Sequence, residues 1–82
     1  MTINLPEKFY ILFDVPGFYD IVEYKVEKVL YSNGALDRMW GVSKHSSDIA
    51  YATDVGRTVF FTEEEAEAGL KTLIEERRNE QP

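Results

Sequence analysis

The chain has 82 residues, a formal net charge of -6 and a sequence pI near 4.6. Its length predicts a single domain over residues 1 to 82, and its 44% hydrophobic and 13% aromatic content predicts a packed core. Cysteine is absent, which excludes disulfides, thiolate zinc sites and thiol catalysis, and the acidic balance disfavours direct binding to nucleic-acid phosphates.

The first predicted element is a strand over residues 8 to 15, KFYILFDV. Its odd-numbered positions, from Phe9 to Val15, are all apolar and share one face, whereas Asp14 lies on the other. We therefore expect this strand to be buried on one face and partly on the other. Pro16 and Gly17 then predict a turn or a short loop that runs to Asp20.

A second strand is predicted over residues 21 to 31, IVEYKVEKVLY. Apolar residues alternate as far as Val26, and the apolar phase then slips by one residue, so that Val29 continues the pattern. A slip of this kind predicts a β-bulge or sharp bend near Glu27 and Lys28, which lets one strand serve two sheets of a small barrel. Two separate short strands are the alternative.

The next segments read as a meander of short strands. Asn33-Gly34 predicts a type I′ hairpin turn, because both residues accept a positive φ. A strand over 36 to 43 follows, with Leu36, Trp40 and Val42 expected to face inward together. KHSSD reads as a loop, and further strands are expected at 48 to 53 and 57 to 61.

The last element is an acidic helix predicted over residues 63 to 78. Thr62 and Glu65 match a capping box, in which the Thr62 hydroxyl accepts from a free N–H and Glu65 reaches back to the cap residue. Glutamates crowd its first turn, where the helix dipole favours them. A buried stripe is expected at Ala66, Leu70, Leu73 and Ile74. Gly69 borders this stripe, and we expect it to let the helix approach a strand closely.

Candidate catalytic and metal-binding residues are sparse. His45 is the single histidine and lies in a polar loop without a nucleophile elbow, so we expect it to be an exposed loop residue. Asp14 and Asp20 flank a turn but match no calcium loop, so we expect solvated charges. We therefore expect no enzyme activity, no metal and no cofactor.

Candidate binding residues are the aromatic residues of the strands and the outer face of the helix. Tryptophan and tyrosine are frequent anchors of protein interfaces, although a small core also needs them. The expected contact surface consists of Trp40, Tyr24, Tyr31, Glu64, Glu67 and Lys71. For Trp40 a core position and a surface position remain equally open.

One segment carries a resemblance to a known group of proteins. DVGRTVFFTEEEAEAGLKTL, residues 54 to 73, resembles the signature G-K-T-V-F-L-T-x-E-E-A-E-x-A-L of small uncharacterised phage and prophage proteins from Gram-positive gut bacteria. The matching residues are Gly56, Thr58, Val59, Phe60, Thr62, Glu64, Glu65, Ala66, Glu67 and Leu70. Arg57, Phe61 and Gly69 depart from it. The resemblance implies an α+β fold, a small SH3-like barrel or roll of about five antiparallel strands closed by one C-terminal helix.

The resemblance also implies a function class. Small acidic phage proteins without catalytic residues often bind a host protein, as inhibitors of CRISPR and other defence nucleases do. We expect a soluble, cytoplasmic protein without membrane contact, since no stretch approaches the roughly 20 apolar residues that span a bilayer. The expected partner is a basic host nuclease or nucleoprotein effector, without direct nucleic-acid binding. The alternatives are a self-associating accessory or structural phage protein, which would form a homodimer, and an SH3-like nucleic-acid-associated module.

Overall fold

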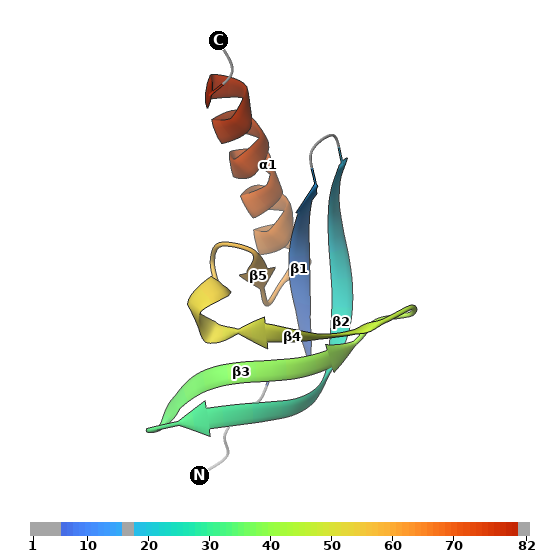
Figure 1. The fold of residues 1–82 in the computed structure, drawn as a ribbon, viewed down its shortest axis with the longest axis vertical. Coiled ribbons are helices and arrows are strands. Elements are labelled where there is room, and N and C mark those ends of the chain that lie inside the picture. Colours follow the sequence, from blue (N-terminus) through green and yellow to red (C-terminus); the bar gives the residue numbers. More distant parts are fainter. Residues whose placement is uncertain (1–5, 16–17, 81–82) are drawn as a thin grey trace.

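The computed structural model describes residues 6–15 and 18–80, so the turn predicted at Pro16-Gly17 lies outside the described residues. The fold is α+β, with a five-stranded antiparallel sheet and a C-terminal helix (Figure 1). The elements are β1 (Lys8–Val15), β2 (Phe18–Ser32), β3 (Ala35–Val42), β4 (Ser47–Tyr51), the 3₁₀ helix η1 (Ala52–Asp54), β5 (Val59–Phe60) and α1 (Glu63–Glu80). The strands lie in the order β4-β3-β2-β1-β5.

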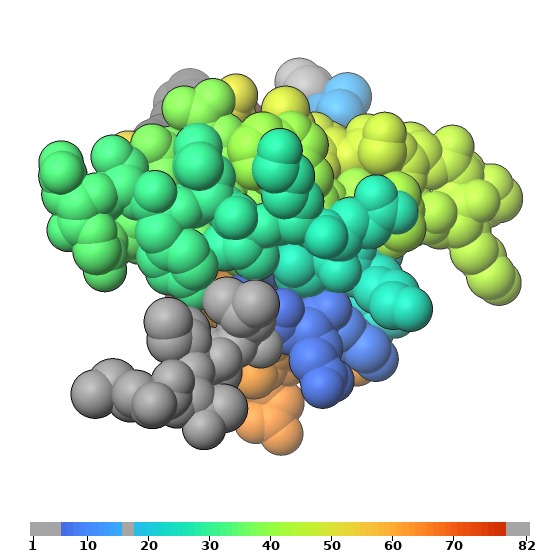
Figure 2. All heavy atoms as spheres, turned by 90° about the horizontal axis from the view of Figure 1, so that it is seen from below, coloured from blue at the N-terminus to red at the C-terminus, as the bar shows by residue number. Residues whose placement is uncertain are grey.

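The predicted bulge in the second strand is confirmed. The β2–β3 register shifts between Val26 and Lys28, which leaves Glu27 as the extra residue. The first half of β2 pairs with β1, and the second half, from Lys25 onward, pairs with β3. Because a bulge bends a strand, the sheet turns sharply here (Figure 1). Seen from below, the second half forms a broad layer above the start of β1 (Figure 2).

The β2–β3 hairpin has the predicted turn, with φ of 53° at Asn33 and 79° at Gly34. A second irregularity follows, because Leu30 pairs with Arg38 and Tyr31 with Leu36, which leaves Asp37 unpaired. This bulge puts Leu36 and the fully buried Met39 on the same face. The predicted inward face is therefore confirmed for Leu36 and wrong for Trp40 and Val42, which lie on the opposite face from Met39.

Three predicted strands also need corrections of more than one residue at an end. Strand β2 begins at Phe18 rather than residue 21, because it already pairs with the end of β1 there. Strand β4 ends at Tyr51, because the chain then turns into η1. Strand β5 has only two residues, since the N–H groups of Arg57 and Thr58 both donate to the Asp54 carbonyl at 3.0 Å and keep that segment in a turn.

The sheet is open. Strands β4 and β5 form its two edges, and no ladder joins them in the part of the chain that the structure describes. The predicted closure into a barrel is therefore not confirmed. The short β5 pairs with β1 through Val59 and Phe60, and Val59 also forms an isolated bridge with Val55.

Buried clusters cover both faces of the sheet. One lies inside the bend and consists of Phe9, Tyr24, Met39, Ala50 and Val59. The other lies under α1 and consists of Leu12, Phe60 and Ala66, with Leu70 and Leu73 packed against it. The predicted buried stripe of the helix is thus confirmed for these residues.

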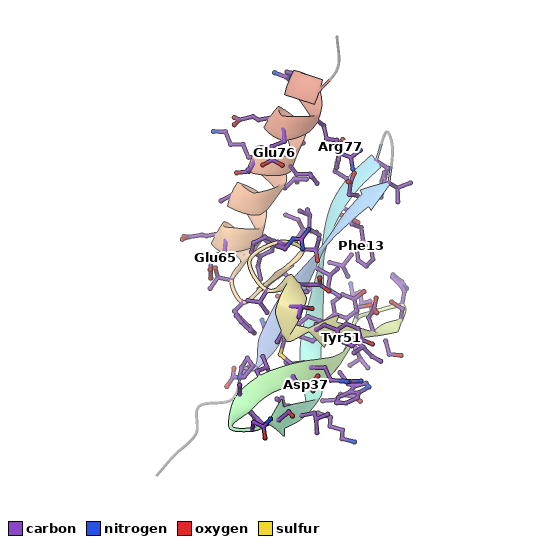
Figure 3. All side chains as sticks on the ribbon, turned by 60° about the vertical axis from the view of Figure 1, so that its left-hand side comes forward. Phe13, Asp37, Tyr51, Glu65, Glu76 and Arg77 are labelled. Carbon is purple, nitrogen blue, oxygen red and sulfur yellow. The ribbon has the colours of Figure 1, made fainter. Side chains whose placement is uncertain are left out.

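Helix α1 begins as predicted and extends two residues further than residue 78. The Thr62 hydroxyl accepts from the Glu65 N–H at 3.1 Å and donates to the Glu65 carboxylate at 2.9 Å. Glu65 therefore reaches back to the cap hydroxyl. Further along, Arg77 extends from α1 toward the β1–β2 hairpin and pairs with Asp14, while Phe13 lies on the side of the hairpin away from the helix (Figure 3).

Candidate functional site

The six candidate contact residues do not form one surface. Tyr24 is only 2% exposed and stacks on Phe9, with ring centroids 5.2 Å apart. Burial raises the pKa of Tyr24 above its ordinary value of 10.0. Assigning Tyr24 to a contact surface was therefore wrong. The alternating pattern of β2 shows that Tyr24 shares a face with Val22 and Val26, but it does not show whether that face is buried. The bend of the sheet encloses that face.

Trp40 is half-buried on the outer face of the second half of the sheet. The Lys28 ammonium lies 5.0 Å from the centroid of its ring, and the Arg38 guanidinium lies 5.4 Å from the centroid of the Tyr51 ring. Beside these pairs is a shallow hollow of about 530 Å³, lined by Trp40, Tyr51, Ile49, Ser47, Gly41, Glu27 and Asp48. The charges around this aromatic face are mixed, since Asp37 pairs with Arg38 at 3.1 Å.

Tyr31 lies apart from Trp40. It is 42% exposed and pairs with Leu36, whose side chain packs against the core. Because cross-strand partners share a face, Tyr31 and Trp40 lie on opposite faces of the sheet.

The helix residues Glu64, Glu67 and Lys71 are all exposed. Glu67 stands at the boundary of two depressions. One of about 360 Å³ runs along the helix past Lys71 and Ile74. The other lies between α1 and the β1–β2 hairpin and includes Glu67 but not Glu64.

We call this second depression the acidic groove. It has a volume of about 410 Å³ and is lined by Tyr10, Tyr19, Asp20, Ile21, Glu23, Glu63, Glu67 and Leu70. Four of these eight side chains are carboxylates, and none of the described residues that line it is basic. Two carboxylates come from β2 and two from the first turns of α1, so the groove presents negative charge from both walls.

Local structure explains how the groove is assembled. Tyr10 and Glu23 are cross-strand partners in the β1–β2 register, and the Tyr10 hydroxyl donates to Glu23 Oε1 at 3.0 Å. This hydrogen bond to Glu23 raises the pKa of Tyr10 above its ordinary value of 10.0. Lys8 approaches the same carboxylate at 3.4 Å from outside, and both side chains are more than half exposed. The opposite wall follows from the helix cap, which places Glu63 at the first helical position.

The loop that contains His45 is held by hydrogen bonds between its serines. In the β3–β4 loop the Ser43 hydroxyl donates to the Ser46 carbonyl at 3.1 Å and accepts from the Ser46 N–H at 3.2 Å, which shapes the loop around His45. Within residues 6–15 and 18–80 no group of three or more histidine or acidic side chains is placed to hold a metal ion. No helix among these residues is long and apolar enough to cross a membrane.

Comparisons of the chain with protein-family models, with curated proteins and with solved structures found no match. The sequence patterns do not predict that Tyr10, Tyr19, Glu23 and Glu63 form one cluster. A signal was present, since Tyr19, Ile21 and Glu23 alternate on one face, but it required the β1–β2 register and the position of the helix to be recognised.

Proposed function

We propose that this chain is a non-enzymatic phage or mobile-element protein that binds a host protein through the acidic groove. The partner would be basic, and inhibition of a bacterial defence nuclease in the host cytoplasm is the role that we assign. The observation that carries this proposal is the concentration of four carboxylates in one groove. Carboxylates that converge in a concave surface attract lysine and arginine side chains and speed up encounter with a basic partner.

The tyrosines of the groove support the same function. Tyr10 and Tyr19 stand beside the carboxylates and supply flat apolar surface. Tyrosine is enriched at interface positions that contribute most of the binding energy, and aromatic rings also attract cations. Lysine or arginine side chains can thus contact both charge and ring in this groove. The contacts of Glu67 are part of this proposal, whereas Glu64 and Lys71 lie outside the groove.

We also assign the fold to the SH3-like rolls. The strand order β5-β1-β2-β3-β4 and the bent β2, which serves both halves of the sheet, support this assignment. Homodimerisation through the outer face of β2, β3 and β4 is the rival function. It is favoured by the exposure of Leu30, Ile49 and Tyr51, which are 40%, 37% and 42% exposed.

A capture experiment tests the proposal. The immobilised protein is exposed to bacterial lysate at low and at high salt, and retained proteins are identified by mass spectrometry. We expect a basic host protein that is retained at low salt and released at high salt, because exposed charges are screened by salt. The variant Glu67→Lys should lose it. Glu75→Lys changes the same charge on the same helix outside the groove and should retain it.

A plating assay completes the test. A phage that is restricted by a defence nuclease should form more plaques on host cells that express the wild-type chain or Glu75→Lys than on cells that express Glu67→Lys. The proposal is wrong if the wild-type and Glu67→Lys proteins capture the same set of host proteins and neither changes the plating of the phage.

A further inference from the structure

The first half of β2 has an open edge. Residues 18 to 24 of this strand pair with β1 on one side, whereas pairing with β3 starts only at Lys25. In Figure 1 the upper half of β2 is the outermost strand of its hairpin, with α1 on the far side of β1. An edge of this kind presents unpaired backbone N–H and C=O groups to any extended chain that approaches it.

Hydrogen bonds show which backbone groups point outward. The Ile21 N–H donates to Asp20 Oδ1 at 2.9 Å and thus does not point toward β1. Its cross-strand partner Leu12 likewise turns its N–H away from β2 and donates to the Thr58 carbonyl at 2.7 Å. Because N–H directions alternate along an antiparallel strand, the backbone groups of Tyr19 and Glu23 also point to the open edge.

The same residues carry side chains that line the acidic groove, since Tyr19, Ile21 and Glu23 are all part of its lining. A strand that adds to this edge therefore places the side chains opposite these residues over the groove. Its other side chains project to the opposite face, next to Phe18, which is 60% exposed, and the exposed end of the hairpin at Val15. The groove fits basic side chains, and the opposite face fits apolar ones.

We propose that the partner binds by strand addition: an extended segment of alternating basic and apolar residues pairs antiparallel with the open edge of β2. This inference rests on the proposed function of the acidic groove and specifies the chemistry of the partner. Antiparallel addition continues the arrangement of the rest of the sheet. In this binding mode, backbone hydrogen bonds supply affinity and alternate side chains supply specificity. In the free protein the Asp20 carboxylate accepts the Ile21 N–H, and in the complex a carbonyl of the partner backbone accepts it instead.

The edge of β4 has the same local hydrogen bond but a different environment. The Ile49 N–H donates to Asp48 Oδ1 at 2.9 Å. The hollow beside it combines Trp40 and Tyr51 with Glu27 and Asp48, while Lys28 and Arg38 lie over the two rings. This mixed charge selects no basic segment. At the edge of β2, Lys25, Lys44 and His45 line a separate hollow beside residues 21 to 25, but none of them lines the acidic groove, and we therefore assign the partner to the edge of β2.

Two fluorescein-labelled peptides test the proposal. One alternates lysine and valine, and the other has the same composition with its lysines and valines in two separate blocks. Fluorescence anisotropy with the full-length chain should show binding of the alternating peptide that is tighter by about tenfold or more, because only it makes backbone and groove contacts at once. Equal affinities would overturn the proposal, and so would failure of both peptides to bind.

Methylation of peptide amides gives the second test. In the proposed complex the lysine amides donate to β2 and the valine amides point to solvent. Methylating the lysine amides should abolish binding, whereas methylating the valine amides should leave it within about threefold, a change near 0.6 kcal/mol. Antiparallel addition would be overturned if only methylation of the valine amides weakened binding, or if methylation of the lysine amides and of the valine amides weakened binding equally.

Protein variants separate this proposal from the one on which it rests. Glu67→Lys should weaken the alternating peptide and Glu75→Lys should not, with both proteins shown to be folded by circular dichroism. If Glu67→Lys weakens both peptides and the two peptides bind the parent equally, the groove binds basic chains without strand addition. That result overturns the inference made here and leaves the function of the groove in place.

Discussion

Gly69→Ala sets two effects on stability against each other. In a helix interior, alanine is about 0.8 to 1.0 kcal/mol more favourable than glycine. At this position, however, the new Cβ would lie 2.4 Å from Cζ and 3.0 Å from Cε2 of the Phe60 ring. Carbon atoms in contact are normally about 3.5 to 4.0 Å apart, so the ring or the helix must move by roughly 1 Å or more.

The surroundings of Phe60 make that movement costly. The residue is 7% exposed and packs in one cluster with Leu12 and Ala66. Overpacking of a filled core costs about 1 to 3 kcal/mol, so the expected net effect of Gly69→Ala is a destabilisation of about 0 to 2 kcal/mol. For a domain of this size that corresponds to a melting temperature lower by up to about 15 °C, and Gly69→Leu should lower it further.

Thermal unfolding followed by circular dichroism measures the outcome. Ala68→Gly is the matched control, because Ala68 is the exposed neighbour in the same helix and reports the propensity difference alone. The double variant Gly69→Ala with Phe60→Leu tests the cause, since a smaller side chain at residue 60 should make the alanine less harmful. If Gly69→Ala raises the melting temperature by as much as Ala68→Gly lowers it, the close contact with Phe60 has no energetic weight and the reasoning is refuted.

Three further predictions concern the cap, the hairpin and the core tyrosine. Thr62→Ala removes the cap hydroxyl and should destabilise the chain by about 1 kcal/mol in urea unfolding, whereas Thr62→Ser should restore most of it. Gly34→Ala should cost about 1 kcal/mol because φ is 79° there, and an unchanged urea midpoint would contradict this. Burial raises the folded-state pKa of Tyr24, so the folded protein keeps its proton where the unfolded chain loses it, and stability should fall as pH rises above about 10. Urea unfolding between about pH 9 and 11 should show a shallower fall for Tyr24→Phe, and an equal fall would refute that assignment.

Much of the fold follows from local sequence rules because those rules act within a few residues. The phase slip after Val26 predicts the bulge at Glu27, and Asn33-Gly34 predicts the hairpin. Trp40 was placed on the wrong face for a different reason. Strand β3 is short and its apolar residues alternate irregularly, so its sequence gives no sign of the bulge at Asp37. This bulge turns Met39 into the core in place of Trp40.

The acidic groove was less accessible to prediction than the fold. Glu67 was identified from the helix alone, whereas its partners in the groove come from β1 and β2. Tyr10 and Glu23 become neighbours through the β1–β2 register. Helix α1 lies close to them where the small Gly69 and Ala66 pack against Phe60. Tyr24 shows the reverse case, in which an apparent surface candidate is buried because the bend at Glu27 brings Met39 of β3 and Ala50 of β4 against it.

The charge pattern along the open edge of β2 also discriminates between partners. An exposed edge next to Phe18 would favour pairing with a second copy of the chain unless something opposed it. Two-fold antiparallel pairing of two such edges puts the acidic grooves of both copies side by side on one face of the joined sheet, and like charges that face each other across paired strands are destabilising. A basic segment meets no such repulsion. The same carboxylates therefore disfavour a homodimer through this edge and favour a basic partner, so Glu23→Lys should weaken peptide binding and at the same time promote self-association, which light scattering would detect.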